Sequence, residues 1–320
     1  MSGKLVLCAT PIGNLGDITP RVLEALRDAD RIAAEDTRNS RKLLTHFDIH
    51  TPMISYHENN RFDRGRELVD KMLQGETIAL ITDAGTPGIS DPGEELVAMA
   101  AEAGIAVTSL PGAAACITAL TLSGLPTRRF VMEGFLPREK KERAEVLEEL
   151  QEETRTIILY EAPHRLKRTL AELADVLGTE RRIALCRELT KLHETILRET
   201  IGDALRRYGV RGAEAATAQN SPERKAETGR GSVIPEKSGQ EAEMRIGTEE
   251  PRGEYVLVIE GRSREAVRAG KQAAWEKMTP EEHVAHYVAQ GMAQKDAIKQ
   301  TAKDRGVGKR DVYQQVMKKE

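Results

Sequence analysis

One stretch decides the fold: Thr82-Asp83-Ala84-Gly85-Thr86-Pro87-Gly88-Ile89-Ser90-Asp91-Pro92-Gly93. It follows the apolar run 77–81, which is typical of a buried strand, and it precedes the helical pattern 94–100. Such a loop has two interpretations. It is a pair of tight turns before a capped helix, with Asp91 as the N-cap and Glu94 in a capping box. Alternatively, it is a ligand-binding loop at the carboxyl end of a parallel strand.

Strands and helices alternate through the first part of the chain. Segments with helical patterns separate apolar runs that predict strands, at 5–9, 31–34, 53–55, 77–81 and 106–110. This order predicts a parallel α/β sheet. The loops at 10–20, 82–93 and 109–115 are rich in Gly, Pro and small residues. Because the carboxyl ends of parallel strands share one edge of a sheet, we expect these loops to form one ligand pocket, built largely from backbone groups.

The second part of the chain has a less regular order. Predicted strands at 130–133, 156–160, 182–186, 195–200 and 254–259 alternate less cleanly with helices, which favours a second α/β domain with a mixed sheet. Between the last two strands, about 210–252 is polar and has no aromatic residue, which predicts a disordered insert. We therefore predict an N-terminal α/β domain over 1–125, a second α/β domain over 126–262 and a helical module over 263–320.

The C-terminal module differs in charge from the rest. From Arg262 onward it holds thirteen Lys and Arg and eight Asp and Glu, a net charge of +5, whereas the whole chain of 320 residues has a net charge of −3. The turn Arg305–Gly308 between its last two predicted helices is similar to a helix-turn-helix. Two interpretations stay open: a helical module that packs on an enzyme, or a basic module that holds nucleic acid by its phosphates.

Composition excludes several classes of protein. The cysteines Cys8, Cys116 and Cys186 lack the spacing of zinc or redox motifs, and no metal-ligand cluster is present, so we expect no metal. No signal peptide and no apolar stretch that could span a bilayer can be recognised, so we expect a cytoplasmic protein with no membrane association. An aromatic content of 3% argues against base stacking as the main function.

Charged residues follow two of the predicted strands, 31–34 and 156–160. Glu35, Asp36 and Arg38 come directly after the strand 31–34. They are either the solvated N-terminus of the helix 40–47, with Asp36 near its N-cap, or a pair of carboxylates and a cation at the active edge of the sheet. His164 is likewise either a surface residue in the first turn of a helix or a site residue.

Six motifs together resemble the signature of the ribosomal RNA small subunit methyltransferase I family. In this sequence they are Ala9–Thr19 (ATPIGNLGDIT), Ala34–Arg38 (AEDTR), Thr82–Gly93, Leu110–Gly112 (LPG), Tyr160–Arg165 (YEAPHR) and Arg187–Leu192 (RELTKL). The match covers nearly all of 4–205 and resumes at Arg252–Gly261. The resemblance implies the tetrapyrrole-methylase fold, two α/β domains with S-adenosylmethionine between them, usually as a homodimer. It implies 2′-O-methylation of a cytidine in the 16S rRNA of the small ribosomal subunit.

The resemblance also implies which residues act. It places the cofactor on the three loops, at Pro11, Gly13, Asp83, Gly85, Thr86, Pro87, Gly88, Ile89, Ser90, Pro111, Gly112 and Ala113. An acid after the second strand lies near the substrate in the wider superfamily, so we expect Glu35 or Asp36 to polarise the ribose hydroxyl. We expect the RNA to contact Arg38, Glu161, His164, Arg165 and Lys191. The alternatives are a methyltransferase for small tetrapyrrole-type molecules and a non-catalytic ribosome-binding factor.

Overall fold

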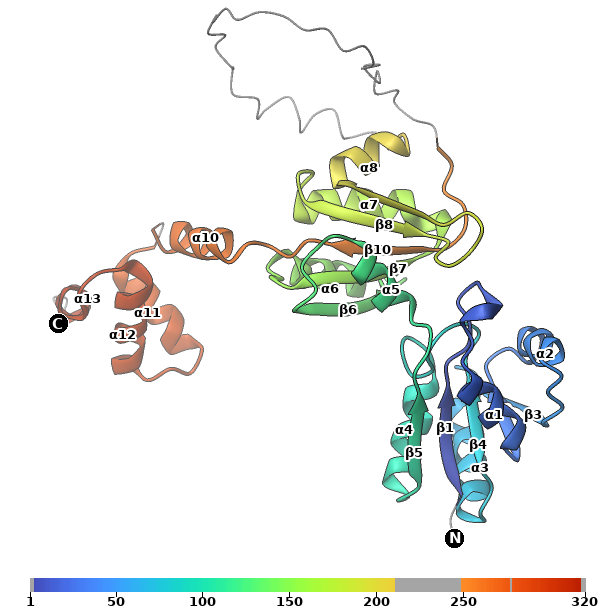
Figure 1. Ribbon diagram of the computed structural model, residues 1–320. Coiled ribbons are helices and arrows are strands. Elements are labelled where there is room, and N and C mark those ends of the chain that lie inside the picture. Colours follow the sequence, from blue (N-terminus) through green and yellow to red (C-terminus); the bar gives the residue numbers. More distant parts are fainter. Residues whose placement is uncertain (1–2, 211–248, 277, 318–320) are drawn as a thin grey trace, which may run out of the picture. The chain divides into compact units, whose positions relative to one another are not determined.

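The computed structural model describes residues 3–210, 249–276 and 278–317 (Figure 1). The chain divides into two compact units. Of the described residues, those within 1–150 and 155–260 form the first, and those within 151–154 and 261–320 form the second. The predicted disordered insert at about 210–252 falls almost entirely outside the described residues.

The first unit begins with a parallel sheet, as the strand–helix alternation predicts. Its strand order is β3-β2-β4-β1-β5 and every neighbouring pair is parallel. The strands are β1 (Lys4–Cys8), β2 (Arg31–Ala34), β3 (Met53–Ser55), β4 (Ile78–Ile81) and β5 (Ala106–Leu110). The helices are α1 (Pro20–Asp28), α2 (Thr37–His46), α3 (Arg61–Leu73) and α4 (Gly93–Glu102), with a short 3-10 helix η1 at Leu15–Asp17.

Helices cover both faces of this sheet. On β1, Val6 and Cys8 share a buried cluster with residues of α1 and α2, whereas Leu5 and Leu7 share another with residues of α3 and α4. Successive side chains of a strand point to opposite faces, so a strand covered on both sides must be apolar throughout. This explains why β1, β2 and β4 read as continuous apolar runs. The polar groups of this region are left to the loops at the strand ends.

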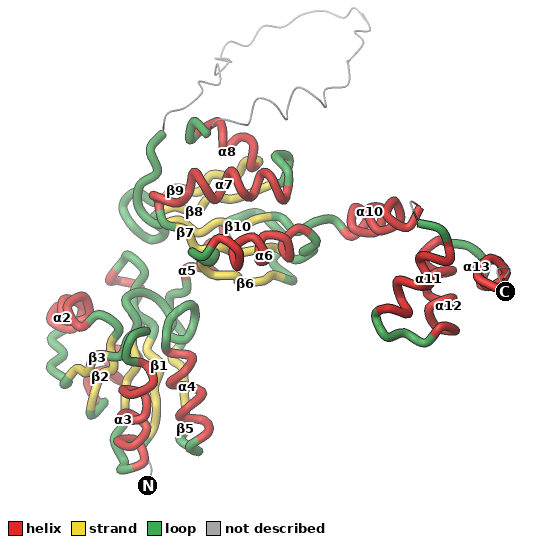
Figure 2. The backbone as a smooth tube through the Cα atoms, turned by 180° about the vertical axis from the view of Figure 1, so that it is seen from behind, coloured by secondary structure: helices red, strands yellow, loops and turns green. Residues whose placement is uncertain are grey.

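The second sheet of the first unit is mixed, also as predicted. Its order is β6-β7-β10-β8-β9, in which only β6 and β7 are parallel. Figure 2 shows the strands of this sheet in yellow and its helices in red. Its strands are β6 (Phe130–Phe135), β7 (Thr156–Glu161), β8 (Arg182–Arg187), β9 (Thr195–Thr200) and β10 (Tyr255–Ile259). Its helices are α5 (Ala115–Leu122), α6 (Lys140–Gln151), α7 (Pro163–Leu177) and α8 (Ile201–Arg207).

Helix α5 connects the two sheets in sequence and packs on the second. Its Cys116, Ala119 and Leu120 share a buried cluster with Ile158 of β7 and Val256 of β10. Ile12, from the loop after β1, joins the same cluster. The division predicted after residue 125 stays a prediction, but the contacts of α5 already belong to the second sheet. The other face of that sheet is covered by α6, α7 and α8.

The second unit is helical. Its helices are α10 (Arg264–Glu276), α11 (Pro280–Ala289), α12 (Gln294–Arg305) and α13 (Lys309–Met317). Thr279 caps α11 in a capping box with Glu282, and Pro280 takes the first helical position. A small core formed by Val284, Ile298 and Val312 holds α11, α12 and α13 together.

Candidate active site

The three Gly- and Pro-rich loops meet at the carboxyl edge of the parallel sheet. Thr10 and Gly85 exchange two backbone hydrogen bonds of 2.9 and 3.0 Å, which join the loops after β1 and β4. The Thr86 hydroxyl donates to the carbonyl of Ala113 at 2.9 Å, which adds the loop after β5. The prediction that these loops converge is confirmed.

The loop after β4 ends differently from the prediction. Asp91 is not the N-cap of α4, which begins at Gly93 after Pro92, and Glu94 forms no capping box. The Asp91 carboxylate instead accepts the backbone N–H groups of Gly88, Ile89 and Gly93, at 2.8–3.2 Å. A carboxylate inside a turn satisfies several donors at once, so Asp91 holds the loop in shape rather than starting the helix.

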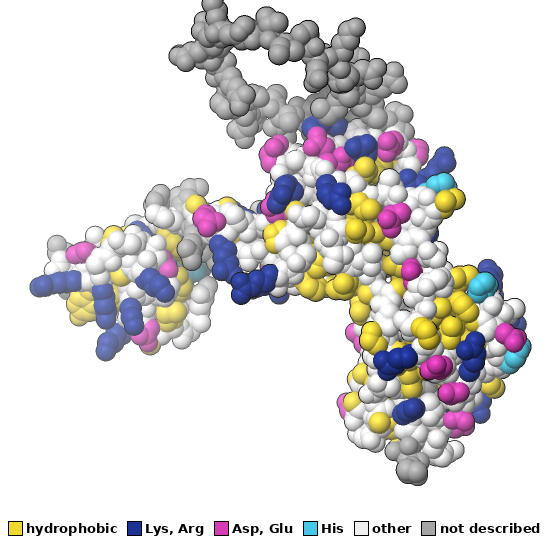
Figure 3. All heavy atoms as spheres, in the orientation of Figure 1, with side chains coloured by type: hydrophobic (Ala, Val, Ile, Leu, Met, Phe, Trp, Pro, Cys, Tyr) yellow, Lys and Arg dark blue, Asp and Glu magenta, His cyan; other side chains and the backbone are white. Residues whose placement is uncertain are grey.

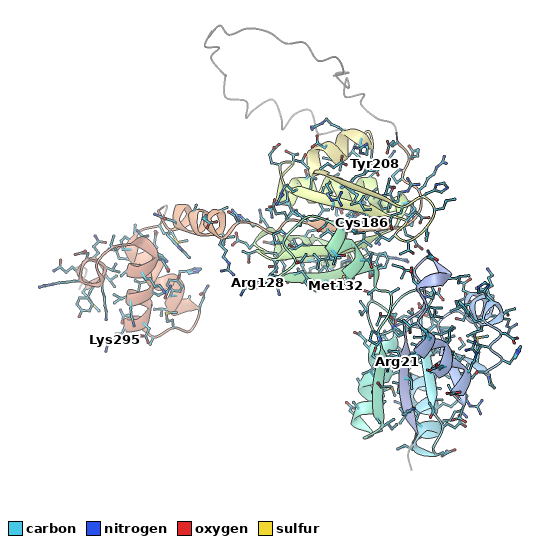
Figure 4. All side chains as sticks on the ribbon, in the orientation of Figure 1. Arg21, Arg128, Met132, Cys186, Tyr208 and Lys295 are labelled. Carbon is cyan, nitrogen blue, oxygen red and sulfur yellow. The ribbon has the colours of Figure 1, made fainter. Side chains whose placement is uncertain are left out.

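A cavity of about 630 Å³ opens beside these loops, within the first unit. Residues of both sheets line it. From the parallel sheet come Ile12, Glu35, Thr82, Asp83, Ala84, Gly85, Thr86, Ile89, Ser90 and Asp91, and from α5 and the second sheet come Ala114, Ala115, Cys116, Phe135, Tyr160, Glu161, Ala162, Pro163, His164, Cys186, Leu189, Glu254, Tyr255 and Val256. Cys186 is labelled on β8 in Figure 4. We call this space the acidic cavity, for the reason given next.

The charges on the cavity wall are almost all negative. Five carboxylates line it, and of the described lining residues none is Lys or Arg. His164 is the one residue there that can carry a positive charge, and its side chain is exposed. A wall of this kind favours a ligand that is cationic in part and repels free anions.

Two of these carboxylates lie together after β2 and β4. The Thr82 hydroxyl donates to Oε2 of Glu35 at 2.6 Å, which fixes the Glu35 side chain at the cavity wall. The backbone N–H of Asp36 donates to Oδ1 of Asp83 at 3.2 Å. Partial desolvation, and next the negative charge of Glu35, raise the pKa of Asp83. The two strand ends therefore form one acidic corner.

Asp36 has a different position from its neighbour Glu35. It is the N-cap of α2, where Oδ1 accepts the backbone N–H of Arg38 at 2.8 Å, and its carboxylate also pairs with the Arg38 guanidinium at 3.1 Å. The hydrogen bonds from Arg38 lower the pKa of Asp36. Asp36 and Arg38 are not among the residues that line the cavity.

Across the cavity, β7 and α7 present a buried carboxylate. Glu161 is 2% exposed, accepts the backbone N–H of Ala162 at 2.8 Å and accepts a short hydrogen bond from the Thr169 hydroxyl. Thr169 in turn accepts from the buried guanidinium of Arg143 at 2.8 Å. Since each member of this network has a partner, Glu161 keeps its orientation toward the cavity without leaving a buried charge unsatisfied.

An aromatic wall stands beside Glu161. The rings of Phe135 and Tyr160 lie 5.5 Å apart at a tilt of 58°, and both line the cavity. Burial, and next the nearby Cys116, raise the pKa of Tyr160, so the phenol stays neutral. These rings and the aliphatic residues of the lining give the cavity an apolar part.

The cations predicted to hold RNA do not line the cavity. The Arg165 guanidinium donates to the carbonyl of Leu136 at 2.8 Å. Lys191 bridges Glu188 and Glu254, with 2.9 Å from Nζ to each carboxylate. Burial opposes its charge, but the hydrogen bonds to these two acids hold the pKa of Lys191 above its usual value.

Backbone strain is concentrated in the loops around the cavity. Of the four non-glycine residues with positive φ in the described chain, three lie there: Ser90 (61°), Glu188 (51°) and Thr190 (66°). Ser90 packs against Gly134 of β6. A Cβ added at Gly134 would lie only 2.9 Å from the Ser90 Oγ. Left-handed conformations in such residues cost energy and often mark functional sites.

The predicted cofactor residues therefore fall into two groups. Asp83, Gly85, Thr86, Ile89 and Ser90 line the cavity. The others do not line it, namely Pro11, Gly13, Pro87, Gly88, Pro111, Gly112 and Ala113. At Gly13 an added Cβ would lie 2.4 Å from Cγ of Lys191, and at Gly112 it would lie 2.6 Å from Cβ of Ala9. These glycines allow segments to pack closely rather than exposing backbone to a ligand.

Several lining residues were not predicted. The most prominent are Tyr160, Tyr255, Val256 and Cys116, which come from the second sheet and from α5. Tyr160 begins a motif that the sequence singled out, so its place before Glu161 was a usable signal. Tyr255 and Val256 lie in an apolar run that gives no sign of which side chains face a ligand.

The described residues contain neither a membrane-spanning helix nor a metal-binding group of side chains. No helix there is long and apolar enough to cross a membrane. No group of three or more His, Cys, Asp and Glu there could hold a metal ion.

Comparisons with known proteins agree with the fold and with the motifs. A family model described as Tetrapyrrole (Corrin/Porphyrin) Methylases matches residues 4–205. The chain is 46% identical over 311 residues to Ribosomal RNA small subunit methyltransferase I of Halalkalibacterium halodurans, which covers 97% of this chain and 93% of that protein. It is 42% identical over 311 residues to the protein of the same name from Bacillus subtilis, with 97% and 93% covered.

Solved structures share the fold at low sequence identity. The crystal structure of diphthine synthase matches with a TM-score of 0.54 at 13% identity, covering 82% of this chain and 91% of that chain. The methyltransferase CobJ matches with a TM-score of 0.51 at 16% identity, covering 81% and 95%. Identities this low establish the fold alone. The family model and the curated relatives establish more: the chain belongs to the tetrapyrrole methylase family and, within it, to the ribosomal RNA small subunit methyltransferase I family.

Proposed function

We propose that this protein transfers a methyl group from S-adenosylmethionine to the 2′-hydroxyl of a cytidine in the 16S rRNA of the small ribosomal subunit. The acidic cavity carries the proposal. S-Adenosylmethionine joins an adenine ring, a ribose, a carboxylate and two cationic centres, the sulfonium and the ammonium, so its net charge is positive. A cavity of about 630 Å³ with an apolar side, an acidic corner and no Lys or Arg among its described lining residues fits such a ligand.

The residues assigned to the methyl donor lie on both sides of the cavity. Gly85, Thr86 and Ser90 would offer backbone and hydroxyl groups, and Asp83 would face its positive charge. The aromatic wall of Phe135 and Tyr160 would hold apolar parts of the ligand. When bound, the donor supplies an electrophilic methyl group. Most of the acceleration of such a transfer comes from alignment of the reactants, which the loops joined by Thr10 and Gly85 would keep fixed.

We assign the proton of the ribose hydroxyl to Glu35. A 2′-hydroxyl is a poor nucleophile until its proton begins to leave, so a carboxylate at the cavity wall would assist. Glu35 lines the cavity and is oriented by Thr82. Asp36, the other predicted acid, already accepts the N–H groups that begin α2. Glu35 is therefore the favoured base, and Asp36 would position the strand end.

RNA contacts are assigned to side chains near this edge of the sheet. The Arg38 side chain is 88% exposed, so its guanidinium can reach a phosphate while it pairs with Asp36. His164 lines the cavity and could contact the nucleotide there. Because Arg165 and Lys191 are engaged with protein groups, we assign them mainly to holding the loops that frame the substrate. We also keep the expectation of a homodimer, which light scattering of the purified protein would test.

Methyl transfer can be tested directly. The protein would be incubated with radiolabelled S-adenosylmethionine and small ribosomal subunits from cells that lack it, and 2′-O-methylated nucleotides in 16S rRNA would be mapped by mass spectrometry. We expect one new 2′-O-methylcytidine. A methyl group on a base, or transfer only to a porphyrinoid substrate in parallel reactions, would contradict the proposal. Donor binding without transfer to any of these substrates would favour a non-catalytic ribosome-binding factor.

A further inference from the structure

The turn between α12 and α13 organises the second unit. Helix α12 ends at Arg305 and is capped by Gly306, which has φ of 65°, and α13 begins at Lys309. A left-handed glycine is the usual way to end a helix and turn the chain sharply. The predicted turn at Arg305–Gly308 between two helices is therefore present. Val312 of α13 packs in the core with Ile298 of α12, so the two helices keep a fixed angle.

One basic residue of this unit serves the fold. The Arg305 guanidinium donates to the carbonyls of Trp275 and Met278 at 2.7 and 2.5 Å, and its Nε donates to Nδ1 of His283 at 3.1 Å. His283 stacks on Trp275 with 3.9 Å between ring centroids. Arg305 thus ties α10 and α11 to the end of α12. The lysines of α12 differ from Arg305, because they are exposed.

A second feature of this unit is a groove between α12 and α13. It has a volume of about 350 Å³ and is lined by Gln294, Lys295, Ile298, Lys309, Tyr313 and Met317. Ile298 and Met317 make it partly apolar, Lys295 and Lys309 bring two ammonium groups to it, and Tyr313 is 51% exposed. Of these described lining residues none is acidic. We call it the lysine groove.

The positive charge continues along α12. Lys295, Lys299 and Lys303 are spaced four residues apart, so they lie along one side of the helix, and all three are exposed. Figure 3 shows Lys and Arg side chains projecting from this helical region, and Figure 4 labels Lys295 at its surface. A row of lysines beside a groove that holds an aromatic ring is typical of surfaces that follow a nucleic-acid backbone.

We propose that the lysine groove binds a single-stranded segment of RNA, with phosphates on Lys295 and Lys309 and a base stacked on Tyr313. This rests on the proposed function, because it takes the partner to be rRNA. Unpaired bases offer a ring face to aromatic side chains, whereas the deep major groove of an RNA duplex is not accessible to them. The low aromatic content of the whole chain does not oppose this, since one exposed ring is enough for one stacked base.

The test uses the full-length protein and a fluorescein-labelled oligouridylate, which contains no cytidine and so cannot be the methylation target. Binding would be measured by anisotropy between about 50 and 200 mM salt. Lys295→Gln and Lys309→Gln are compared with Lys141→Gln, on α6 in the first unit, which removes the same charge from a side chain that is 85% exposed. Tyr313→Ala is compared with Tyr313→Phe, which keeps the ring.

We expect each groove lysine variant to bind more weakly and to lower the slope of log affinity against log salt by about 0.7, the value for one phosphate contact on a single strand. We expect Tyr313→Ala to weaken binding roughly 5- to 150-fold and Tyr313→Phe to keep it. If the groove variants bind like Lys141→Gln, or if Tyr313→Phe binds as weakly as Tyr313→Ala, the proposal is overturned.

Two further outcomes separate this proposal from its alternatives. Equal binding of an RNA duplex, unaffected by Tyr313→Ala, would overturn it in favour of duplex backbone contacts. Normal oligouridylate binding by the groove variants, together with weaker retention on intact small subunits, would overturn it in favour of a ribosomal protein as the partner. Methylation of small subunits is measured separately, so the groove can fail while the proposed activity stands, and the reverse.

Discussion

The acidic cavity and the lysine groove have similar constituents and opposite charge. Each combines an apolar part, at least one aromatic ring and charged side chains from neighbouring elements. The cavity carries five carboxylates and the groove two ammonium groups, and of the described residues that line each space none has the opposite full charge except His164 when protonated. The chain separates a surface suited to a cationic ligand from one suited to an anionic polymer.

This separation explains why the net charge of the chain is uninformative. A net charge of −3 with a pI near 6.2 suggests no affinity for nucleic acid. The excess of five positive charges from Arg262 onward is masked by acids elsewhere, among them the lining of the cavity. For a protein proposed to bring a cationic methyl donor and a polyanion together, the distribution of charge is more instructive than its sum.

The largest effect is expected at the acidic corner. Glu35→Gln should lower turnover by about 10²- to 10⁴-fold, the usual contribution of a general base, while donor affinity changes little. Asp36→Asn, which keeps an N-cap side chain for α2, should lower turnover by less than about tenfold. Single-turnover methylation and calorimetry of donor binding would measure both.

The two substitutions form a matched pair, because the residues are adjacent and each change removes one charge. Turnover that collapses in Asp36→Asn and survives in Glu35→Gln would assign the base to Asp36. Asp36→Ala adds a structural control, since loss of the cap alone should cost about 1 kcal/mol of stability.

These two acids also show what can be predicted from the sequence. The parallel sheet, the mixed sheet and the meeting of three loops follow from apolar periodicity and from the geometry of parallel strands. Which of Glu35 and Asp36 faces the cavity does not follow, because both stand at the end of β2 and both suit the start of a helix. That choice depends on Thr82, a residue distant in sequence whose hydroxyl orients Glu35.

Asp91 and the second sheet show the same limit. Asp-Pro before a helical pattern predicts an N-cap at Asp91, but the turn at Gly88 and Ile89 offers its carboxylate more donors than the helix does. Tyr255 and Val256 enter the cavity because β10 lies between β7 and β8. Neither contact could be inferred from local pattern, because long-range pairing decides both.

A smaller effect is expected at the loop that joins β4 to α4. Gly85 has φ of 91° and pairs with Thr10, so Gly85→Ala should strain the bridge between two cavity loops and weaken donor binding roughly tenfold. Gly104→Ala is the matched control. Gly104 also has positive φ, at 69°, but an added Cβ there would meet nothing within 4 Å.

Both variants should lose about 1 kcal/mol of stability, because alanine is strained at positive φ. Thermal unfolding would measure that loss, and calorimetry would measure donor affinity. If both variants bind the donor as the unaltered protein does, the bridge at Gly85 does not shape the donor site.

A still smaller effect is expected from the charge of Asp83. Its pKa is raised by partial desolvation and by Glu35, so it loses its negative charge at a higher pH than an ordinary aspartate. Affinity for the cationic donor should therefore fall as pH is lowered through that raised pKa. Asp83→Asn should bind about two- to fivefold more weakly at neutral pH, the contribution of an exposed ion pair, and should lack this pH dependence. An unchanged pH profile in the variant would show that another group is responsible.

The smallest effect is expected at His283, in the second unit, which carries the lysine groove. Burial, and next the Arg305 charge, lower its pKa from the usual 6.5, because protonation of Nδ1 would set an N–H against the guanidinium that now donates to it. A histidine whose pKa is lower in the folded state stabilises the fold above about pH 6.5, and that stability is lost as pH falls toward the folded pKa.

Trp275, the single tryptophan of the chain, stacks on His283 and reports on this unit by its fluorescence. The unfolding midpoint of this unit should decrease as the pH is lowered from about 7 to about 5. In His283→Gln the midpoint should change less over that range, whereas His50→Gln, which alters an exposed histidine of the first unit, should behave like the unaltered chain. If His283→Gln keeps the full pH dependence, the acid sensitivity of this unit comes from another group.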